Sequence, residues 1–560
     1  MTRASLAAAL VVGTFLVAAA VACGRSHDGF TEATDAGPGV PSFVDDDAAI
    51  HQCSGQGSSS LGCEYLAVHM DGTFDADNGC FVVFLANSSP TYPAHVDAQF
   101  DGTPIDLSRF AKTPRGTGRS LTYATFDPNA GIAPGDVAIL FLAGPPKPGT
   151  PSVYSNDPVP CPVKPALSAL TQIHGSGFGE SFRIRTDQPV AAYQMLPYGG
   201  GSAAVTGATL LSPTGAWGTN YVAANAYQLV GQDFGNNEPS LDIVAVEDGT
   251  TVTMVPTVDV NPGVGFPGLK AGQKATYKLH AGQVLQFTQQ QELTGTPIQS
   301  NKPVGVFGGF TCLDVGAQCC CDHSEQQIPS VQQLGSTYVA AGYRERTQFP
   351  EDRLWRIVGA VNGTQLTYDP PVGGPTTLSK GQIAEFHTDT PFVVRSQDAQ
   401  HPFLFLSYMS GANNLGTSSD EQGYGDPDVV RVVPTPQWQT GYIFFTDPTY
   451  PETDLVFVRA KHNGAFADVT LDCVGTLTGW TPVDGSDEYE MTRADLVRHD
   501  FQKQGACDNG RHEASSSQPF ALTVWGWGSP ETQVMTGYVS YGYPAGQDLA
   551  PINHVVVPPQ

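Results

Sequence analysis

The chain has 560 residues, with 54 Asp and Glu against 27 Lys and Arg, and a formal net charge of −27. This balance excludes a general nucleic-acid-binding role, because such proteins need clustered cations to neutralise phosphates. The 62 glycines and 44 prolines argue against long helices and favour many short strands joined by tight turns.

An export signal is predicted at residues 1–22. Arg3 precedes an uncharged, mostly apolar run at residues 6–22, which ends in the small-residue cleavage site Ala20-Val21-Ala22. Cys23 follows at once and resembles the lipobox cysteine of bacterial lipoproteins, although Ala20 stands where Leu is usual. We therefore expect Cys23 to be acylated, and the exported protein to be lipid-anchored to the bacterial outer membrane at the cell surface. A plain cleaved signal and an uncleaved anchor helix are the alternatives.

Residues 23–50 are polar and rich in Pro, Gly and Asp, which predicts a disordered tether. Beyond the tether, four marks recur in the same order: an aromatic start after a Gly, a Gly-Thr turn, a second Gly turn, and a Pro that enters an apolar strand. The prolines, at 189, 303, 402 and 519, lie 114, 99 and 117 residues apart. The other marks are Tyr221, Tyr338 and Tyr442, then Asp101-Gly102, Asp248-Gly249 and Asn362-Gly363, then Gly135, Gly282 and Gly381.

This repeat predicts an all-β fold of tandem β-sandwich-like modules, about four repeats of roughly 100 residues. The expected modules are residues 51–210, 211–327, 328–433 and 434–560. Pairs of four-stranded blades have a similar size, so a β-propeller-like arrangement is the alternative. The Asp-Gly and Asn-Gly pairs supply the positive φ that hairpin turns require.

Eleven cysteines are present, and ten remain when Cys23 is set aside for lipidation. An even number in an exported protein predicts up to five disulfides. Local arrangement favours Cys53–Cys63, Cys473–Cys507, and a bond from Cys312 to one of the cysteines at 319–321. The ten candidates are Cys53, Cys63, Cys80, Cys161, Cys312, Cys319, Cys320, Cys321, Cys473 and Cys507.

Several segments together carry a family resemblance. They are Thr296–Val306, Cys321–Gln326, Gly425-Asp426-Pro427 and Gly537–Gly546. From about residue 60 to the end, the chain resembles the N-terminal domain of IgG Fc-binding proteins, in the form found among bacterial surface lipoproteins. The resemblance implies an extracellular, non-enzymatic role in binding or structure, and it implies no particular ligand.

One run concentrates metal-binding side chains, namely Cys319, Cys320, Cys321, Asp322, His323, Ser324 and Glu325. Zinc ligands are usually spaced two to four residues apart, and consecutive side chains of an extended stretch point to opposite faces. In an oxidising compartment these thiols favour disulfides. We expect disulfides here, with His323 a structural hydrogen-bonding residue, and zinc binding or thiol catalysis as the alternatives. No catalytic residue, metal ligand or cofactor is predicted.

Three other patterns each have two readings. The oxygen-rich segment Asp233–Glu238 is either a calcium loop or, as we expect, a solvated acidic loop. Trp525 and Trp527 share one face of a strand and form core or a carbohydrate platform, and core is expected. Gly425–Asp428 is similar to a Gly-Asp-Pro-His self-cleavage site, but Asp428 stands in place of the His, so a turn is expected.

The function expected from these observations is that of a cell-surface binding or adhesion module without enzymatic activity. Its partner would be an unknown protein or glycan, its membrane contact would be the lipid anchor alone, and it would not bind nucleic acid. One alternative is a structural component of the envelope or matrix, whose modules pack against copies of themselves. The other alternative is a metal-dependent hydrolase that uses residues 319–325.

Overall fold

The computed structural model describes residues 53, 58–145, 157–203, 205–227, 237–315, 321–348, 350–351, 353–411, 423–483, 485, 487–532 and 537–560. Residues 44–560 form one compact unit. The predicted signal, Cys23 and the tether lie outside the described residues, as do Cys319 and Cys320. None of the helices in the described ranges combines the length and the apolar character needed to cross a membrane.

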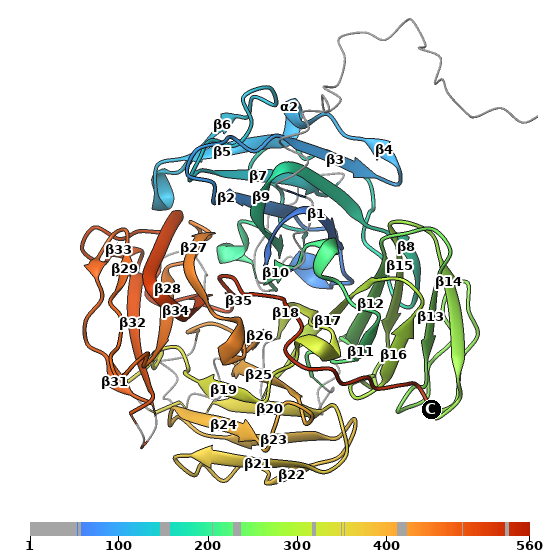
Figure 1. The fold of residues 1–560 in the computed structure, drawn as a ribbon. Coiled ribbons are helices and arrows are strands. Elements are labelled where there is room, and N and C mark those ends of the chain that lie inside the picture. Colours follow the sequence, from blue (N-terminus) through green and yellow to red (C-terminus); the bar gives the residue numbers. More distant parts are fainter. Residues whose placement is uncertain are drawn as a thin grey trace, which may run out of the picture. The chain divides into compact units, whose positions relative to one another are not determined.

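The fold is all-β, as predicted. Every strand pair is antiparallel, and the described helices are short: α2 (Leu107–Phe110) and a few 3-10 turns. The strands form four groups of sheets, which we call modules 1 to 4 in chain order (Figure 1). The module boundaries predicted from the sequence stay a prediction, because residues 44–560 are not divided into separate bodies.

Module 1 is a nine-stranded sheet of order β4-β3-β9-β2-β7-β5-β6, with β1 and β10 also paired to β9. The long strand β9 (Phe182–Leu196) pairs with β1 and β3 through its first half, and with β2 and β10 through its second half. The other strands are β1 (Leu61–Ala67), β2 (Phe81–Asn87), β3 (Val96–Phe100), β4 (Thr103–Pro104), β5 (Ala111–Arg115), β6 (Thr122–Thr125), β7 (Val137–Ala143) and β10 (Gly207–Leu211).

Module 2 has two sheets, of order β11-β16-β13-β14 and β18-β17-β12-β15-β8. They share one apolar core, to which Val252 and Ile298 come from the first sheet and Leu241 and Leu285 from the second. The strands are β8 (Gly177–Glu180), β11 (Asn220–Val222), β12 (Pro239–Ala245), β13 (Thr250–Met254), β14 (Ala275–Leu279), β15 (Gln283–Thr288), β16 (Pro297–Ser300), β17 (Val304–Leu313) and β18 (Asp322–Ile328).

Module 3 repeats this plan with the orders β19-β24-β21-β22 and β23-β20-β25-β26. Aromatic residues dominate the shared core, and Trp355 stacks on Phe405 at a centroid distance of 5.2 Å. The strands are β19 (Thr337–Ala340), β20 (Leu354–Gly359), β21 (Thr364–Asp369), β22 (Thr377–Leu378), β23 (Ile383–His387), β24 (Phe392–Ser396), β25 (Phe403–Met409) and β26 (Asp428–Arg431).

Module 4 is again a nine-stranded sheet, of order β30-β29-β34-β28-β32-β31, with β27 and β35 paired to the long strand β34 (Arg511–Trp527) and β33 paired to β32. The remaining strands are β27 (Gln439–Phe445), β28 (Glu452–Ala460), β29 (Val469–Leu471), β30 (Gly475–Thr476), β31 (Thr481–Pro482), β32 (Tyr489–Arg498), β33 (Gln502–Lys503) and β35 (Ser540–Pro544).

The innermost strands of the modules close a ring. β10 contacts β18, β18 contacts β26, β26 contacts β35, and β35 returns to β10. The closed ring of four modules is the propeller-like arrangement that the sequence analysis gave as the alternative. Its blades differ from single-sheet blades in modules 2 and 3, each of which consists of two sheets packed over one core. The segment before β1 also contacts the segment after β35, since the Ser60 N–H donates to the carbonyl of Gln547 at 2.7 Å.

Two of the sequence marks meet in space in modules 2 to 4, and in module 1 Tyr65, which the sequence analysis did not mark, takes the place of the start tyrosine. The start tyrosine of each module donates its hydroxyl hydrogen bond to the carbonyl of the residue that follows the marked proline. The O···O distance is 2.6 Å from Tyr65 to Val190, 2.7 Å from Tyr221 to Val304 and 2.6 Å from Tyr338 to Phe403, and Tyr442 makes the same bond to Phe520. Each hydroxyl thus ties the first strand of its module to the strand that pairs with the module's innermost strand.

The marked turns have the expected backbone, but two of them are not hairpins. Gly102, Gly249 and Gly363 all have positive φ, between 68° and 77°. Asp101-Gly102 joins the paired strands β3 and β4, as predicted. The turns at Gly249 and Gly363 instead join β12 to β13 and β20 to β21, which belong to different sheets. The chain arches between layers there, because consecutive strands must cover both sides of one core.

Four disulfides join described cysteines: Cys53–Cys63, Cys80–Cys161, Cys312–Cys321 and Cys473–Cys507. The two local pairs and the bond from Cys312 into the 319–321 run follow the sequence prediction. Cys80–Cys161 was not assigned from the sequence, because its partners are 81 residues apart. These disulfides indicate an oxidising, extracellular environment.

Candidate functional site

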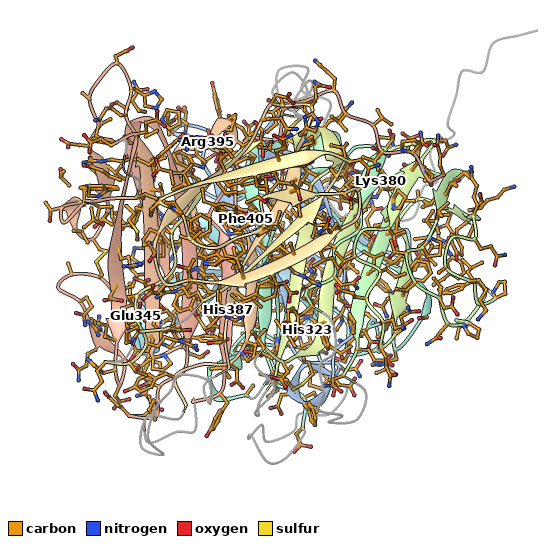
Figure 2. The ribbon with its side chains drawn as sticks, turned by 90° about the horizontal axis from the view of Figure 1, so that it is seen from below. His323, Glu345, Lys380, His387, Arg395 and Phe405 are labelled. Carbon is orange, nitrogen blue, oxygen red and sulfur yellow. A yellow bond between two sulfur atoms is a disulfide. The ribbon has the colours of Figure 1, made fainter. Side chains whose placement is uncertain are left out.

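The described part of the run that concentrates metal-binding side chains in the sequence leads into the inner strand of module 2. Cys321 is bonded to Cys312, and the next seven residues are β18, in which every residue is buried. His323 and Glu325 are each 0% exposed. In Figure 2, His323 lies toward the lower edge of the sheets, on the side away from Arg395 and Lys380. From Cys321 onward the run is therefore buried and is not open to a substrate.

One face of β18 holds the centre of the ring together. The Asp322 carboxylate accepts hydrogen bonds from the backbone N–H of Thr206 and from that of Ser540, the latter at 2.7 Å. Gln326 Nε2 donates to the carbonyl of Ala208 at 3.1 Å. Burial raises the pKa of Asp322 well above its usual range. These side chains join module 2 to modules 1 and 4, so their role is structural.

The other face of β18 points toward module 1. His323 and Glu325 share this face, because side-chain direction repeats every two residues. Register places Ser240 opposite Gly309 and Gly309 opposite Glu325, so Ser240 and Glu325 stand on either side of a residue without a side chain. Met70 of module 1 fills that gap: a Cβ on Gly309 would lie 2.9 Å from its methyl carbon.

We call His69, Asp242, His323 and Glu325 the interface cluster. The Gln194 side chain links it to module 1, because its Nε2 donates to Glu325 Oε2 at 2.7 Å and to the carbonyl of Val68 at 3.0 Å. His323 Nε2 lies 3.8 Å from Glu325 Oε2. Asp242 follows Ser240 by two residues and shares its face. Two modules therefore contribute acidic and imidazole side chains to one buried interface.

The protonation states in this interface are set by burial. Burial, with help from neighbouring His323 and His174, lowers the pKa of His69 to about 3, so that its imidazole is neutral. Burial raises the pKa of Asp242 well above its usual range, and the nearby carboxyls of Asp71 and Glu325 add to the shift. Hydrogen bonding to Asp71 raises the pKa of the half-exposed His174.

Most polar atoms of the interface cluster lack a hydrogen-bond partner among the described residues. They are both carboxylate oxygens of Asp242, both ring nitrogens of His323, Glu325 Oε1 and His69 Nε2, and the hydroxyls of Ser240 and Ser324 join them. Neither ring nitrogen of His323 has a hydrogen-bond partner among the described residues, so the expectation that His323 is a structural hydrogen-bonding residue stays a prediction.

Asp242 and His69 were not singled out from the sequence. A signal for Asp242 was available, since it is a lone carboxylate in the apolar run Leu241–Ala245 and the whole strand is buried. His69 offers no comparable signal, because it lies in a polar loop after β1 and becomes part of the interface only through the packing of module 1 on module 2.

The other candidate residues are structural where they are described. Trp525 and Trp527 are buried, as expected for core, and Tyr343 packs against both rings at centroid distances of 5.0 and 5.9 Å. Asp426 and Asp428 are buried near the centre of the ring, and Asp428 begins β26. Asp233–Asn236, the core of the possible calcium loop, lie outside the described residues.

In a second group of potential metal-binding side chains, the ligand atoms are already used in a disulfide and in hydrogen bonds. Asp472, Cys473 and His512 bring one ligand atom each within 4.8 Å of one another. The Cys473 sulfur is already bonded to Cys507. His512 uses both ring nitrogens, Nδ1 with Asp472 at 2.9 Å and Nε2 with the carbonyl of Asp508 at 2.6 Å. This group therefore stabilises the disulfide region and offers no free ligand set.

Comparison with known proteins identifies the family. The IgGFc binding protein family matches residues 207–526, a span that begins at β10 and ends within β34. The human IgGFc-binding protein is 25% identical over 302 residues, which are 52% of this chain and 5% of the human protein. The chain thus spans a small part of that protein's length. No solved structure matches. Because the family match covers more than half of the chain, the protein belongs to the IgGFc-binding protein family.

Proposed function

We propose that this protein is an extracellular, non-enzymatic binding protein that recognises a protein partner through the loops on its surface. The observation that carries the proposal is the family match over modules 2 to 4. The disulfides support an extracellular location. A supporting point is that the residues with catalytic potential in the sequence, His323 and Glu325, are closed off inside the fold.

The proposed location is the surface of a bacterial cell. The apolar run at residues 6–22, the small residues before Cys23 and the polar stretch that follows support cleavage, acylation and a tether. Two or more acyl chains on one cysteine hold a protein stably, whereas a single chain binds reversibly. The anchored modules would then face partners outside the cell.

The binding proposal is tested with the full-length protein, purified from membranes with its disulfides intact. Immobilised protein is exposed to the Fc fragment of IgG, the partner in the human relative's name, and to panels of extracellular proteins and glycans. We expect saturable binding to at least one protein, which is lost after reduction of the disulfides. Absence of saturable binding across the protein panel, or binding that survives unfolding, would overturn the proposal.

The anchor is tested by intact-mass analysis and by Cys23→Ser. The mature chain should begin at Cys23 and carry the mass of its acyl chains, and the variant should no longer fractionate with membranes. A Cys53→Ser/Cys63→Ser double variant is the matched control, because it replaces both cysteines of a local disulfide without touching the processing site. An unprocessed chain in the cytosol would contradict the proposed export.

A further inference from the structure

Residues 551–560 follow β35 in the chain and belong to no strand or helix, and we call them the clasp segment. The Ile552 N–H donates to the carbonyl of Gln332 at 2.8 Å, in the 3-10 turn that precedes β19. Asn553 Nδ2 donates to the carbonyl of Val331 in the same turn at 2.7 Å. In Figure 1 the segment runs, in red, from the centre of the ring to the end labelled C beside the strands of module 2. The clasp segment therefore leaves module 4, passes the start of module 3 and ends on module 2.

Alternate side chains of the clasp segment enter the apolar core of module 2. Val555 is 8% exposed and Val557 is 2% exposed, and both belong to the core that includes Leu241 and Ile298. Val556, between them, is 54% exposed. A period of two is that of an extended chain with one face buried. Module 2 thus accepts an apolar side chain at every second position of the segment.

One side chain of module 2 contacts the backbone of the clasp segment through two hydrogen bonds. Asn220, the first residue of β11, donates from Nδ2 to the carbonyl of Val557 at 2.8 Å, and its Oδ1 accepts from the N–H of the same valine at 2.7 Å. The amide therefore satisfies both backbone groups of Val557, as a neighbouring strand would. Sites that recognise extended peptides combine main-chain hydrogen bonds with pockets for alternate side chains. We call Asn220, Val331 and the apolar core beneath the two valines the acceptor site.

The contacts that hold the clasp segment can break while the modules stay folded. Those described above are neutral hydrogen bonds and the packing of two valines. Segments held in this way open locally at a lower free energy than the whole fold needs to unfold. A segment tethered to its own site competes at an effective concentration of about millimolar, so it keeps that site filled in an isolated molecule.

We propose that the acceptor site is a recognition site for an extended segment, and that the clasp segment of a second copy of this chain binds there when the site's own segment is released. The second copy is the partner to which the structure points, because its segment carries the same residues and makes the same contacts. The proposal does not depend on the protein partner proposed above, since it concerns two copies of one chain.

The first test uses the full-length chain and a labelled peptide with the sequence of residues 551–560. In Val557→Asp the chain's own segment leaves the site, because a carboxylate is strongly unfavourable in an apolar core. Fluorescence anisotropy should show saturable peptide binding to Val557→Asp, with a Kd at least about tenfold lower than for the wild type, whose site is filled. No binding to a Val557→Asp chain that keeps the wild-type near-ultraviolet circular dichroism would overturn the proposal.

Two controls locate the peptide on the acceptor site. Val556→Asp changes the exposed neighbour, so its segment should stay in place and the variant should bind no more peptide than the wild type. Adding Asn220→Ala to Val557→Asp removes both hydrogen bonds to the backbone and should weaken peptide binding by about tenfold or more. Equal binding by Val556→Asp and Val557→Asp, or an Asn220→Ala change without effect, would place the peptide elsewhere and contradict the assignment.

The second test asks whether whole chains exchange the segment. Val557→Asp offers an empty acceptor site, and Asn220→Ala offers an intact segment that its own site holds weakly. Light scattering should show a one-to-one complex when the two variants are mixed, and monomers when either is alone. Monomers in the mixture would refute binding between copies. If Val557→Asp fails to fold, hydrogen exchange of the wild type decides: the Val557 amide should exchange faster than the amides of β17, and equal protection would mean that the segment does not leave its site.

Discussion

Removing one hydroxyl from a start tyrosine should destabilise the whole ring. Tyr338 is 1% exposed, and its hydroxyl donates to the carbonyl of Phe403 at 2.6 Å and accepts from the N–H of Gly335 at 2.8 Å. Tyr338→Phe keeps the ring, which packs on Phe403 and Phe405 at centroid distances of 4.9 and 5.8 Å. Each hydrogen bond contributes about 0.5–1.5 kcal/mol net, so the two predict a loss of about 1–3 kcal/mol in the free energy of unfolding.

The assay is equilibrium unfolding in urea, followed by near-ultraviolet circular dichroism and compared through transition midpoints, because a four-module chain need not unfold in one step. Tyr221→Phe should lose a similar amount, since its hydroxyl makes the equivalent bonds at 2.7 and 2.9 Å. Tyr92→Phe is the control, because Tyr92 is 53% exposed. If Tyr338→Phe unfolded at the same midpoint as Tyr92→Phe, the hydroxyl would not tie the strands together, and the physical account of the repeat would fail.

Three further predictions concern buried contacts. Arg356 pairs with Glu292 inside the contact between modules 2 and 3. Arg356→Met should therefore lower the free energy of unfolding, measured by calorimetry, by about 3–5 kcal/mol, and the double variant with Glu292→Met should lose much less. Equal losses in the single and the double variant would mean that the pair is not coupled. Burial raises the pKa of Glu452 to about 7, so the folded state holds a proton that the unfolded state has released. Stability should then fall by roughly 2–3 kcal/mol as the pH rises from about 4.5 to 7, and Glu452→Gln should flatten that slope in urea titrations at pH 5 and 8. Removing the Cys80–Cys161 disulfide by double Ala substitution should cost about 2–5 kcal/mol, and an unchanged thermal midpoint would contradict the assigned bond.

The repeat could be predicted because its marks have local physical causes. Each mark can be recognised in the sequence without knowing which strands pair. The marks are a Gly with positive φ, a Pro whose nitrogen donates no hydrogen bond, and an aromatic residue at the start of the module. The structure explains why the marks travel together, since Tyr221 reaches the residue after Pro303 and Tyr338 the residue after Pro402. Pro189 and Pro519 lie within the long strands β9 and β34, whose later halves pair with the innermost strands β10 and β35.

Long-range pairing could not be predicted. β8 precedes β9 in the chain yet pairs with β15 in the second module, which joins modules 1 and 2 covalently and by backbone hydrogen bonds. No local pattern in Gly177–Glu180 indicates that partner, because strand pairing depends on how whole modules pack. The turns at Gly249 and Gly363 show the same limit: their positive φ follows from the sequence, but whether the next strand returns to the same sheet does not.

The inner strand of module 2 illustrates why chemistry was harder to place than fold. A polar run such as Asp322–Gln327 normally indicates a solvated loop, because polar groups are costly to bury. Here the cost is offset on one face, where Asp322 and Gln326 find backbone partners in modules 1 and 4, and such partners are invisible in sequence. On the other face, Glu325 is held by a side chain instead, since Gln194 of module 1 donates to its Oε2 at 2.7 Å. A strand that is polar on both sides and still buried therefore depends on partners that other modules supply, and a local sequence pattern carries no information about those partners because they come together only when the modules pack.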